Sequence, residues 1–302
     1  MRREGFFMEE HRRHLAGEYE VVVLGATIAG VGGAVAASRA FGKDKVLLLE
    51  SGGEIGGEYL STYRPVSGLE DSRPVDPLAR QLLQELKERR AIRDGILQPV
   101  TLLPVLSHLL KKEYPPTLYN TRLLGLTPAP MLSGREGWQM ELYMDGELTT
   151  LRCATVFDTT RLSDSCRSLE ESPSEVWFHG LVQLPGSGRD PRWFQQVVCD
   201  ELSLCAYAIE DYWTLCMKLE EDSPALGRDR MFQFWKSRPT SMESAVLVAV
   251  ASQAERVYSG VPVRADEGNA KRMLLPEGYA SDPIAALDKG ICLMESLVGE
   301  SR

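Results

Sequence analysis

The sequence predicts an α/β fold in which a parallel sheet, extended by a β-meander, carries a smaller inserted domain of antiparallel strands and helices. Three observations predict it. Residues 20–24 and 45–49 are short apolar runs separated by a helical stretch of small residues, a pattern typical of a strand–helix–strand unit with buried parallel strands. Residues 138–144 and 147–152 alternate in polarity around Asp145 and Gly146, which is a strong hairpin signal. Strand-like and helix-like segments then follow one another through residues 163–261.

The composition indicates a globular protein and argues against several function classes. The chain has 302 residues, which is typical of about two domains, and 43% of them are hydrophobic. With 34 Lys and Arg against 43 Asp and Glu, the net charge of −9 argues against a broad nucleic-acid-binding face. No apolar run is long enough to span a membrane, and the six cysteines form no C-x-x-C pair. We therefore expect a cytoplasmic protein with reduced thiols and with no nucleic-acid, membrane or metal partner.

The first strand leads into a glycine-containing turn and a helix, and the second strand ends in an acidic residue. The turn covers residues 25–30, the helix residues 31–40, and Glu50 follows the second strand. The order of strand, glycine turn, helix, strand and acid is the dinucleotide-binding fingerprint. Gly25 permits the tight turn out of the strand, and Gly30 lets the helix pack closely on the sheet. We therefore expect this unit to bind a dinucleotide.

The start of the helix and the acid after the second strand are the expected contacts. The helix N-terminus, at Thr27, Ile28 and Ala29, offers unpaired N–H groups and a positive dipole end to a pyrophosphate. Thr27 stands where the fingerprint has its middle glycine, and its small side chain can be accommodated while its hydroxyl donates to a phosphate. Glu50 can accept hydrogen bonds from both hydroxyls of an adenosine ribose, and its negative charge repels a 2′-phosphate, which disfavours NADP there.

The loop after Glu50 carries four glycines followed by small polar residues, within residues 51–62. Here the chain resembles the FAD-dependent oxidoreductases of the glutathione-reductase-like flavoprotein superfamily, which has two dinucleotide-binding domains. The resemblance implies noncovalent binding of FAD and a loop that runs under the cofactor. By this resemblance the cofactor is lined by Ser51, Gly56, Gly57, Glu58, Ser61 and Thr62.

Three further segments share this resemblance. Residues 99–114 have the apolar spacing of a helix, and residues 117–126 are similar to the strand whose backbone meets the adenine ring, with Leu123 as the candidate. Residues 154–160 are similar to the strand that returns to FAD and ends close to the pyrophosphate. That turn would contain Asp158, Thr159 and Thr160, where Thr159-Thr160-Arg161 replaces the Ala-Thr-Gly of the family.

Residues 274–290 resemble the family's last motif, a loop that opens a helix facing the flavin pyrimidine. Asp282 is a good helix cap, and Pro283 suits the first helical position. The resemblance implies that the positive end of this helix, at Asp282, Pro283 and Ile284, stabilises the negative charge of reduced flavin.

The middle of the chain carries little chemical information. We expect strands at residues 175–184 and 205–219, helices at 191–204 and 225–235, and either a strand or a helix at 245–251. His179 is a lone histidine in a strand, which is more typical of a satisfied core residue than of a catalytic base. Catalytic residues therefore stay unassigned. Because no second dinucleotide fingerprint is present, reducing electrons would come from the substrate, a partner chain or free nicotinamide.

The sequence thus predicts an FAD-dependent oxidoreductase that transfers a hydride between a small-molecule substrate and flavin. The expected domains are an N-terminal arm at residues 1–18, a Rossmann-like FAD-binding domain split between 19–162 and 262–302, and a substrate or interaction domain at 163–261. Homo- or hetero-oligomers could form through the last of these. Two alternatives stay open, a non-catalytic accessory subunit of a hetero-oligomeric complex and an NAD-binding dehydrogenase.

Overall fold

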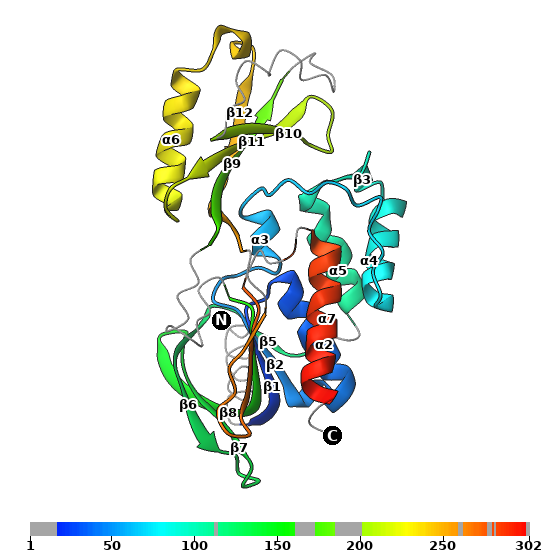
Figure 1. The fold of residues 1–302 in the computed structure, drawn as a ribbon, viewed down its shortest axis with the longest axis vertical. Coiled ribbons are helices and arrows are strands. Elements are labelled where there is room, and N and C mark those ends of the chain that lie inside the picture. Colours follow the sequence, from blue (N-terminus) through cyan, green and yellow to red (C-terminus); the bar gives the residue numbers. More distant parts are fainter. Residues whose placement is uncertain are drawn as a thin grey trace, which may run out of the picture.

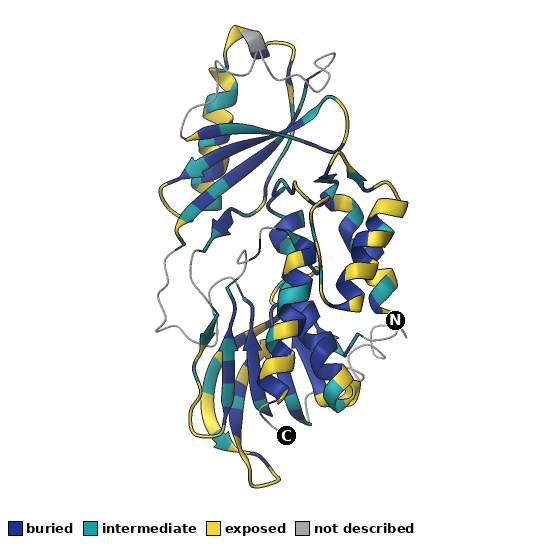
Figure 2. Ribbon diagram, turned by 45° about the vertical axis from the view of Figure 1, so that its right-hand side comes forward, coloured by how far each residue is buried: buried dark blue, intermediate teal, exposed yellow. Residues whose placement is uncertain are grey.

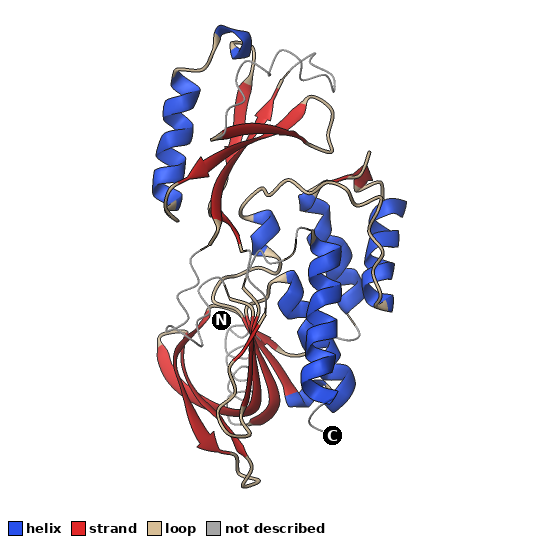
Figure 3. Ribbon diagram, in the orientation of Figure 1, coloured by secondary structure: helices blue, strands red, loops and turns tan. Residues whose placement is uncertain are grey.

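The computed structural model describes residues 17–111, 114–160, 173–184, 201–258, 262–276, 280 and 282–299. Within these ranges the chain forms a large mixed sheet with helices against it and a smaller antiparallel sheet at the other end of the molecule (Figures 1 and 3). Most of the expected N-terminal arm lies outside the described residues. No helix in the described ranges has the length and apolar character needed to cross a membrane.

The large sheet is built around β1 (Glu18–Leu24), whose residues Val21 to Val23 are fully buried. Its strands run in the order β14-β15-β8-β1-β2-β5, and every pair is parallel except β14 with β15. The other strands on this path are β2 (Val46–Leu49), β5 (Thr117–Leu118), β8 (Glu147–Asp158), β14 (Val263–Arg264) and β15 (Lys271–Leu274). The buried parallel strands at both predicted apolar runs are therefore confirmed.

Helices lie on one side of this sheet, and together with its strands they form the largest core among the described residues (Figure 2). The helices are α2 (Ile28–Phe41), α3 (Gly57–Leu60), α4 (Pro77–Glu88), α5 (Leu102–Leu110) and α7 (Pro283–Gly299), with short 3-10 turns at Lys43–Lys45 and Pro99–Thr101. α7 crosses α2 at glycine positions. At one of them, Gly32, a Cβ atom would overlap with the Leu287 backbone of α7. The small residues of α2 thus permit close backbone packing.

The predicted hairpin and the predicted returning strand are joined in the structure. β6 (Thr121–Pro130) pairs with β7 (Glu136–Met144), and β7 pairs antiparallel with the first part of β8. β8 then continues without a break and pairs parallel with β1 from Arg152 to Asp158. One strand therefore belongs to both the meander and the central sheet. The expected β-meander is confirmed, and the expected separation into two strands at residue 153 is wrong.

The second sheet contains the middle of the chain, with the strand order β10-β11-β9-β12 and β13 also paired to β9. Its strands are β9 (Glu175–Gln183), β10 (Leu202–Ala206), β11 (Tyr212–Leu219), β12 (Val246–Val250) and β13 (Glu255–Val257), accompanied by a 3-10 turn at Thr240–Met242. α6 (Pro224–Lys236) packs on one face, where Gly227 leaves room for Phe178. The segment at 245–251, for which either a strand or a helix was expected, forms a strand.

Three sequence expectations need correction. The helix expected at 191–204 lies outside the described residues up to 200, and Leu202 to Leu204 belong to strand β10. The helix expected at 99–114 begins as a 3-10 turn and ends at Leu110. The strand expected at 117–126 is interrupted at Asn120, whose positive φ of 53° separates β5 from β6. α4 was missed, although Asp76 as its cap and Pro77 at its first turn are helix-start signals.

β14, β15 and α7 return to the large sheet after the second sheet is complete. A short hairpin of β3 (Ile92–Arg93) and β4 (Ile96–Leu97) lies between α4 and α5 in the chain. The expected domain boundaries at residues 162 and 262 stay a prediction.

Candidate functional site

A cavity of about 710 Å³ lies at the carboxyl ends of β1, β2 and β8, beside the start of α2. Ligands of open parallel α/β sheets bind at this edge, and the volume is within the usual range for small-molecule sites. Seven of the predicted site residues line it, together with five others. The lining residues are Gly25, Ala26, Thr27, Glu50, Ser51, Gly52, Gly53, Glu54, Gly57, Glu58, Thr160 and Gln253.

The turn between β1 and α2 requires glycine at two positions. Gly25 has a φ of +88°, and a Cβ there would meet the Thr159 and Thr160 backbone at 3.1 Å. A Cβ on Gly30 would lie 2.5 Å from the Thr159 hydroxyl and nearer still to the carbonyl oxygen of Gly25. The two fingerprint glycines therefore let the turn approach the end of β8 closely.

Thr27, in the middle position of the fingerprint, acts within the protein. Its hydroxyl oxygen accepts a hydrogen bond from Gly30 N at 3.0 Å, which caps α2, and its hydroxyl donates to Thr159 Oγ1 at 2.8 Å. Thr159 Oγ1 in turn lies 3.0 Å from the carbonyl oxygens of both Leu24 and Gly25. The Thr27 hydroxyl is thus bonded within the protein, and its donation to a phosphate stays a prediction. The altered turn after Asp158 has a structural role, while Arg161 lies outside the described residues.

Replacing Thr159 by valine is expected to lower the free energy of unfolding by about 1–3 kcal/mol. Valine keeps the shape but removes the fully buried hydroxyl that joins the ends of β1 and β8 to Thr27. Urea denaturation of the two proteins measures the difference. Thr150→Val, at an exposed position of β8, is the matched control and is expected to change stability by less than about 0.5 kcal/mol. Equal effects of the two substitutions would contradict this role of Thr159.

Glu50 closes the other side of the cavity. Its carboxylate accepts hydrogen bonds from Ala26 N and from Gly52 N, both at 2.6 Å. The backbone of the same loop is held by β5 and the start of β6, because Asn120 N donates to Gly52 O at 3.0 Å and Thr121 N to Glu50 O at 2.9 Å. The acid therefore lies against the β1–α2 turn, as the fingerprint predicts.

Leu123, the residue expected beside the adenine ring, does not line this cavity. It is a buried residue of β6 that pairs with Leu142 of β7 and belongs to the core on the meander side of the sheet. The part of the segment that meets the Glu50 loop lies earlier, at Asn120 and Thr121.

The glycine-rich loop brings a third carboxylate to the cavity. Gly56 adopts the left-handed conformation with a φ of 70° immediately before α3, and its N–H donates to Ala26 O at 2.8 Å. The buried carboxylate of Glu58 then accepts a hydrogen bond from Ile28 N at 2.6 Å. Ile28 N is one of the first amides of α2, where a pyrophosphate was expected. Sequence reasoning placed Glu58 near the cofactor but did not foresee this bond.

The remaining residues of the loop lie behind the cavity wall. Thr62 is fully buried and donates to Glu58 O at 2.6 Å, and the Ser61 hydroxyl binds the Glu54 carboxylate. Ala29, Gly30 and Gly56 likewise shape the site without lining the cavity. Of the described residues that do line it, Glu50, Glu54 and Glu58 are acidic and none is Lys or Arg.

The predicted cap of the C-terminal helix is present. Asp282 Oδ1 accepts hydrogen bonds from Ile284 N and Ala285 N, both at 2.9 Å, and Pro283 opens α7. The Tyr59 hydroxyl, on α3, donates to Ala280 O at 3.4 Å, so the α7 start lies against the glycine-rich loop. Asp282, Pro283 and Ile284 do not line the cavity, and residues 277–279 and 281 lie outside the described part of the chain.

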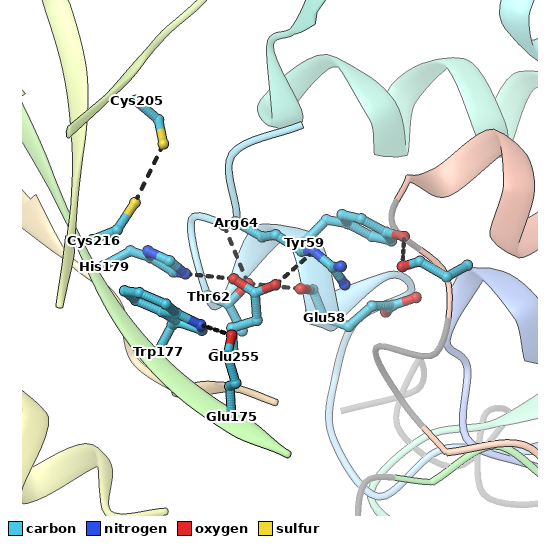
Figure 4. Close-up of polar contacts among 11 residues, drawn as sticks. Glu58, Tyr59, Thr62, Arg64, Glu175, Trp177, His179, Cys205, Cys216 and Glu255 are labelled. Carbon is cyan, nitrogen blue, oxygen red and sulfur yellow. Dashed lines mark hydrogen bonds and ion pairs between the residues drawn. The ribbon is translucent and has the colours of Figure 1, made fainter. Parts of the chain in front are cut away.

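The second sheet contacts the segment that follows α3 through a buried polar network (Figure 4). Glu255 of β13 accepts from Arg64 Nε at 2.8 Å and lies 2.6 Å from His179 Nε2. Burial alone raises the pKa of the Glu255 carboxyl, but the hydrogen bond and charge of His179 and the charge of Arg64 hold that pKa below its usual value. His179 is thus a buried residue bonded within the core. The described residues hold no group of three His, Cys, Asp or Glu side chains that could share a metal ion.

The backbone adds a second link between the sheet and the loop. Ser252 N and Gln253 N donate to Ser61 O at 2.9 and 3.2 Å. Gln253 thereby reaches the cavity from a part of the chain that no motif indicated.

Comparison with known proteins gives a family match and a set of similar folds. Residues 20–168 match the family model described as FAD dependent oxidoreductase. The match confirms the predicted resemblance, and FAD and flavin-dependent oxidation–reduction are the cofactor and the activity class of that family. None of the curated proteins matches the chain.

Solved structures share the fold at low sequence identity. The p-nitrophenol 4-monooxygenase of Pseudomonas putida DLL-E4 is 16% identical with a TM-score of 0.58, and the alignment covers 94% of this chain and 80% of that one. Aklavinone-11 hydroxylase, solved with FAD and aklavinone, is 15% identical with a TM-score of 0.53, covering 93% of this chain and 62% of that one. The L-amino acid deaminase of Proteus myxofaciens, solved with anthranilate, is 13% identical with a TM-score of 0.55, covering 94% and 90%. These likenesses confirm the predicted fold class.

Proposed function

We propose that this chain, whose residues 20–168 match the FAD-dependent oxidoreductase family model, is an enzyme that binds FAD noncovalently in the cavity at the start of α2. The observation that carries the proposal is that one cavity unites the fingerprint turn, its acid and the glycine-rich loop, which are separated in the sequence. Their convergence fits an extended dinucleotide better than a packing role alone.

The residues fit FAD at the turn and at the acid. Gly25 and Gly30 leave the close approach that a side chain would fill, and the N-terminus of α2 points its amides and positive dipole end toward the cavity. Glu50 would exchange its bonds with Ala26 N and Gly52 N for the hydroxyls of the ribose. Glu58 must release Ile28 N before a pyrophosphate takes that amide.

FAD, when bound, supplies acceptance and return of a hydride, and the protein's residues supply binding, orientation and electrostatic stabilisation. Gly57 and Glu58 would line the flavin end of the cavity, with Gln253 closing it from the second sheet. The start of α7, capped by Asp282 and held to α3 by Tyr59, presents the positive end of a 17-residue helix. That end would stabilise negative charge on the reduced cofactor.

The substrate would be a small organic molecule held between the flavin and the second sheet. α6 covers one face of that sheet. His179 and Glu255 lie on the opposite face, where Glu255 also binds Arg64. The fold is shared with a p-nitrophenol monooxygenase and an aklavinone hydroxylase, which supports a small organic molecule as the substrate.

Replacing Glu50 by alanine is expected to weaken FAD binding by about tenfold to a hundredfold, because hydrogen bonds to a charged acceptor contribute about 1.5–3 kcal/mol. Titration of FAD into the full chain, followed by flavin fluorescence, measures the dissociation constant. Glu54→Ala is the matched control, since Glu54 lines the same cavity but binds Ser61 rather than the β1–α2 turn. If both variants bind FAD as tightly as the parent protein, the assignment of the ribose site is wrong.

A non-catalytic accessory subunit is the second candidate, and the bond from Ile28 N to Glu58 favours it. A carboxylate on that amide imitates the anion that a bound cofactor would place there. Such a chain would retain no FAD and would gain or support activity only in a mixture with a partner chain. Retention of one FAD per chain by the purified protein would reject it.

A further inference from the structure

Two cysteines of the second sheet lie close together on neighbouring strands. Cys205 of β10 and Cys216 of β11 have their sulfur atoms 3.8 Å apart, with the Cys216 thiol donating to Cys205 (Figure 4). Cys205 pairs with Thr214 and Cys216 pairs with His179 in the strand register. Because Thr214 and Cys216 are two residues apart on one strand, both thiols lie on the face that carries His179.

The two thiols differ in exposure and in acidity. Cys205 is half-buried, whereas Cys216 is buried. The hydrogen bond from Cys216 lowers the pKa of the Cys205 thiol, while that bond and burial raise the pKa of Cys216. An accessible thiol of lowered pKa beside a second, resolving thiol is the arrangement of redox-responsive cysteine pairs.

We propose that Cys205 and Cys216 form a redox-active dithiol that a hydroperoxide converts to a disulfide. The Cys205 thiolate attacks the peroxide, so that an S–O bond forms, the O–O bond breaks and an alcohol or water leaves. The Cys216 sulfur then attacks Cys205, so that the S–S bond forms and the S–O bond breaks, and water leaves with the Cys216 proton. The two sulfurs lose two electrons in total, and the peroxide gains them.

The position of β10 makes this closure feasible. The sulfur atoms must approach from 3.8 Å to the roughly 2.05 Å of a disulfide. β10 is the edge strand of the sheet and pairs only with β11 among the described strands. Rotation about the side-chain bonds and a small shift of this edge strand supply the approach.

The sequence permits a direct test by peptide mapping. The reduced full chain is treated with hydrogen peroxide, its remaining thiols are alkylated, and it is cleaved after glutamate. Cleavage after Glu201, Glu210 and Glu220 places Cys205 and Cys216 on separate peptides, and Cys199 on a third. We expect the first two peptides to be joined, and to separate again after reduction with a phosphine. The test contains no FAD, so its result is independent of the proposed cofactor.

Three variants sharpen the result. In Cys216→Ser, oxidation is expected to stop at a sulfenic acid on Cys205, which a cyclic dione traps, and in Cys205→Ser the Cys216 thiol is expected to survive. Cys292→Ser removes an exposed thiol elsewhere and is expected to leave the joined peptides unchanged. Survival of both thiols in the parent protein, or joining of Cys205 to Cys199 instead, would overturn the proposal.

Discussion

Replacing Gly290 by alanine is expected to lower the free energy of unfolding by about 3 kcal/mol. Gly290 lies where α7 crosses α2, and a Cβ there would meet the Ala29 carbonyl carbon at 2.7 Å and the carbonyl oxygen nearer still. The atoms it meets are backbone, so no side-chain rotation relieves the overlap and the two helices must separate. Urea denaturation monitored by circular dichroism measures the change.

Gly299→Ala is the matched control for this substitution. Gly299 ends the same helix, and a Cβ there would have no heavy atom within 4 Å. Because alanine has the higher helix propensity, we expect stability to stay within about 0.5 kcal/mol or to rise slightly. A Gly290→Ala protein as stable as the Gly299→Ala protein would show that the helices are not packed as the structure has them.

Replacing Glu58 by glutamine is expected to tighten FAD binding by about tenfold or more, because like charges a few ångströms apart repel by several kcal/mol at a protein surface. Glutamine keeps the size and retains an oxygen that accepts from Ile28 N, so the substitution removes chiefly the charge. The dissociation constant of FAD, measured by fluorescence titration at two salt concentrations, gives the effect. Because Glu58 is buried, salt screens this repulsion only slightly, and the variant should bind FAD more tightly than the parent protein at both concentrations.

Glu54→Gln is the control for charge in general. Glu54 lines the same cavity but binds Ser61 rather than Ile28 N, so its neutralisation is expected to change the dissociation constant by less than about threefold, as for an exposed charge. Weaker FAD binding by Glu58→Gln would contradict this expectation, because it would make Glu58 a ligand of the cofactor rather than a competitor for the Ile28 amide.

The central unit of the fold follows from local pattern. The apolar runs of β1 and β2, the small residues of α2 and the turn signal at Asp145-Gly146 each specify an element without reference to distant residues. The unbroken course of β8 could not be predicted in this way. Its first half is specified by pairing with β7 and its second half by pairing with β1, and such pairings depend on contacts remote in sequence.

Positions in the candidate site that depend on backbone geometry could be predicted from the sequence, whereas contacts between side chains distant in the sequence could not. Gly25 and Glu50 have positions that the fingerprint turn itself imposes. The bonds of Thr27 to Thr159 and of Ile28 to Glu58 join residues 132 and 30 positions apart, and Gln253 reaches the cavity from the second sheet. No local signal carries these contacts, because they form only after the loops are folded against one another.

FAD binding by this chain is tested most directly by the visible absorption spectrum of the full chain after incubation with FAD and removal of unbound cofactor. We expect a flavin spectrum with one FAD per chain, which a denaturant releases because the binding is noncovalent. We also expect the melting temperature to rise with FAD concentration, since a ligand of the folded state stabilises it. A colourless protein whose melting temperature is unchanged by FAD would show that the chain does not bind the cofactor.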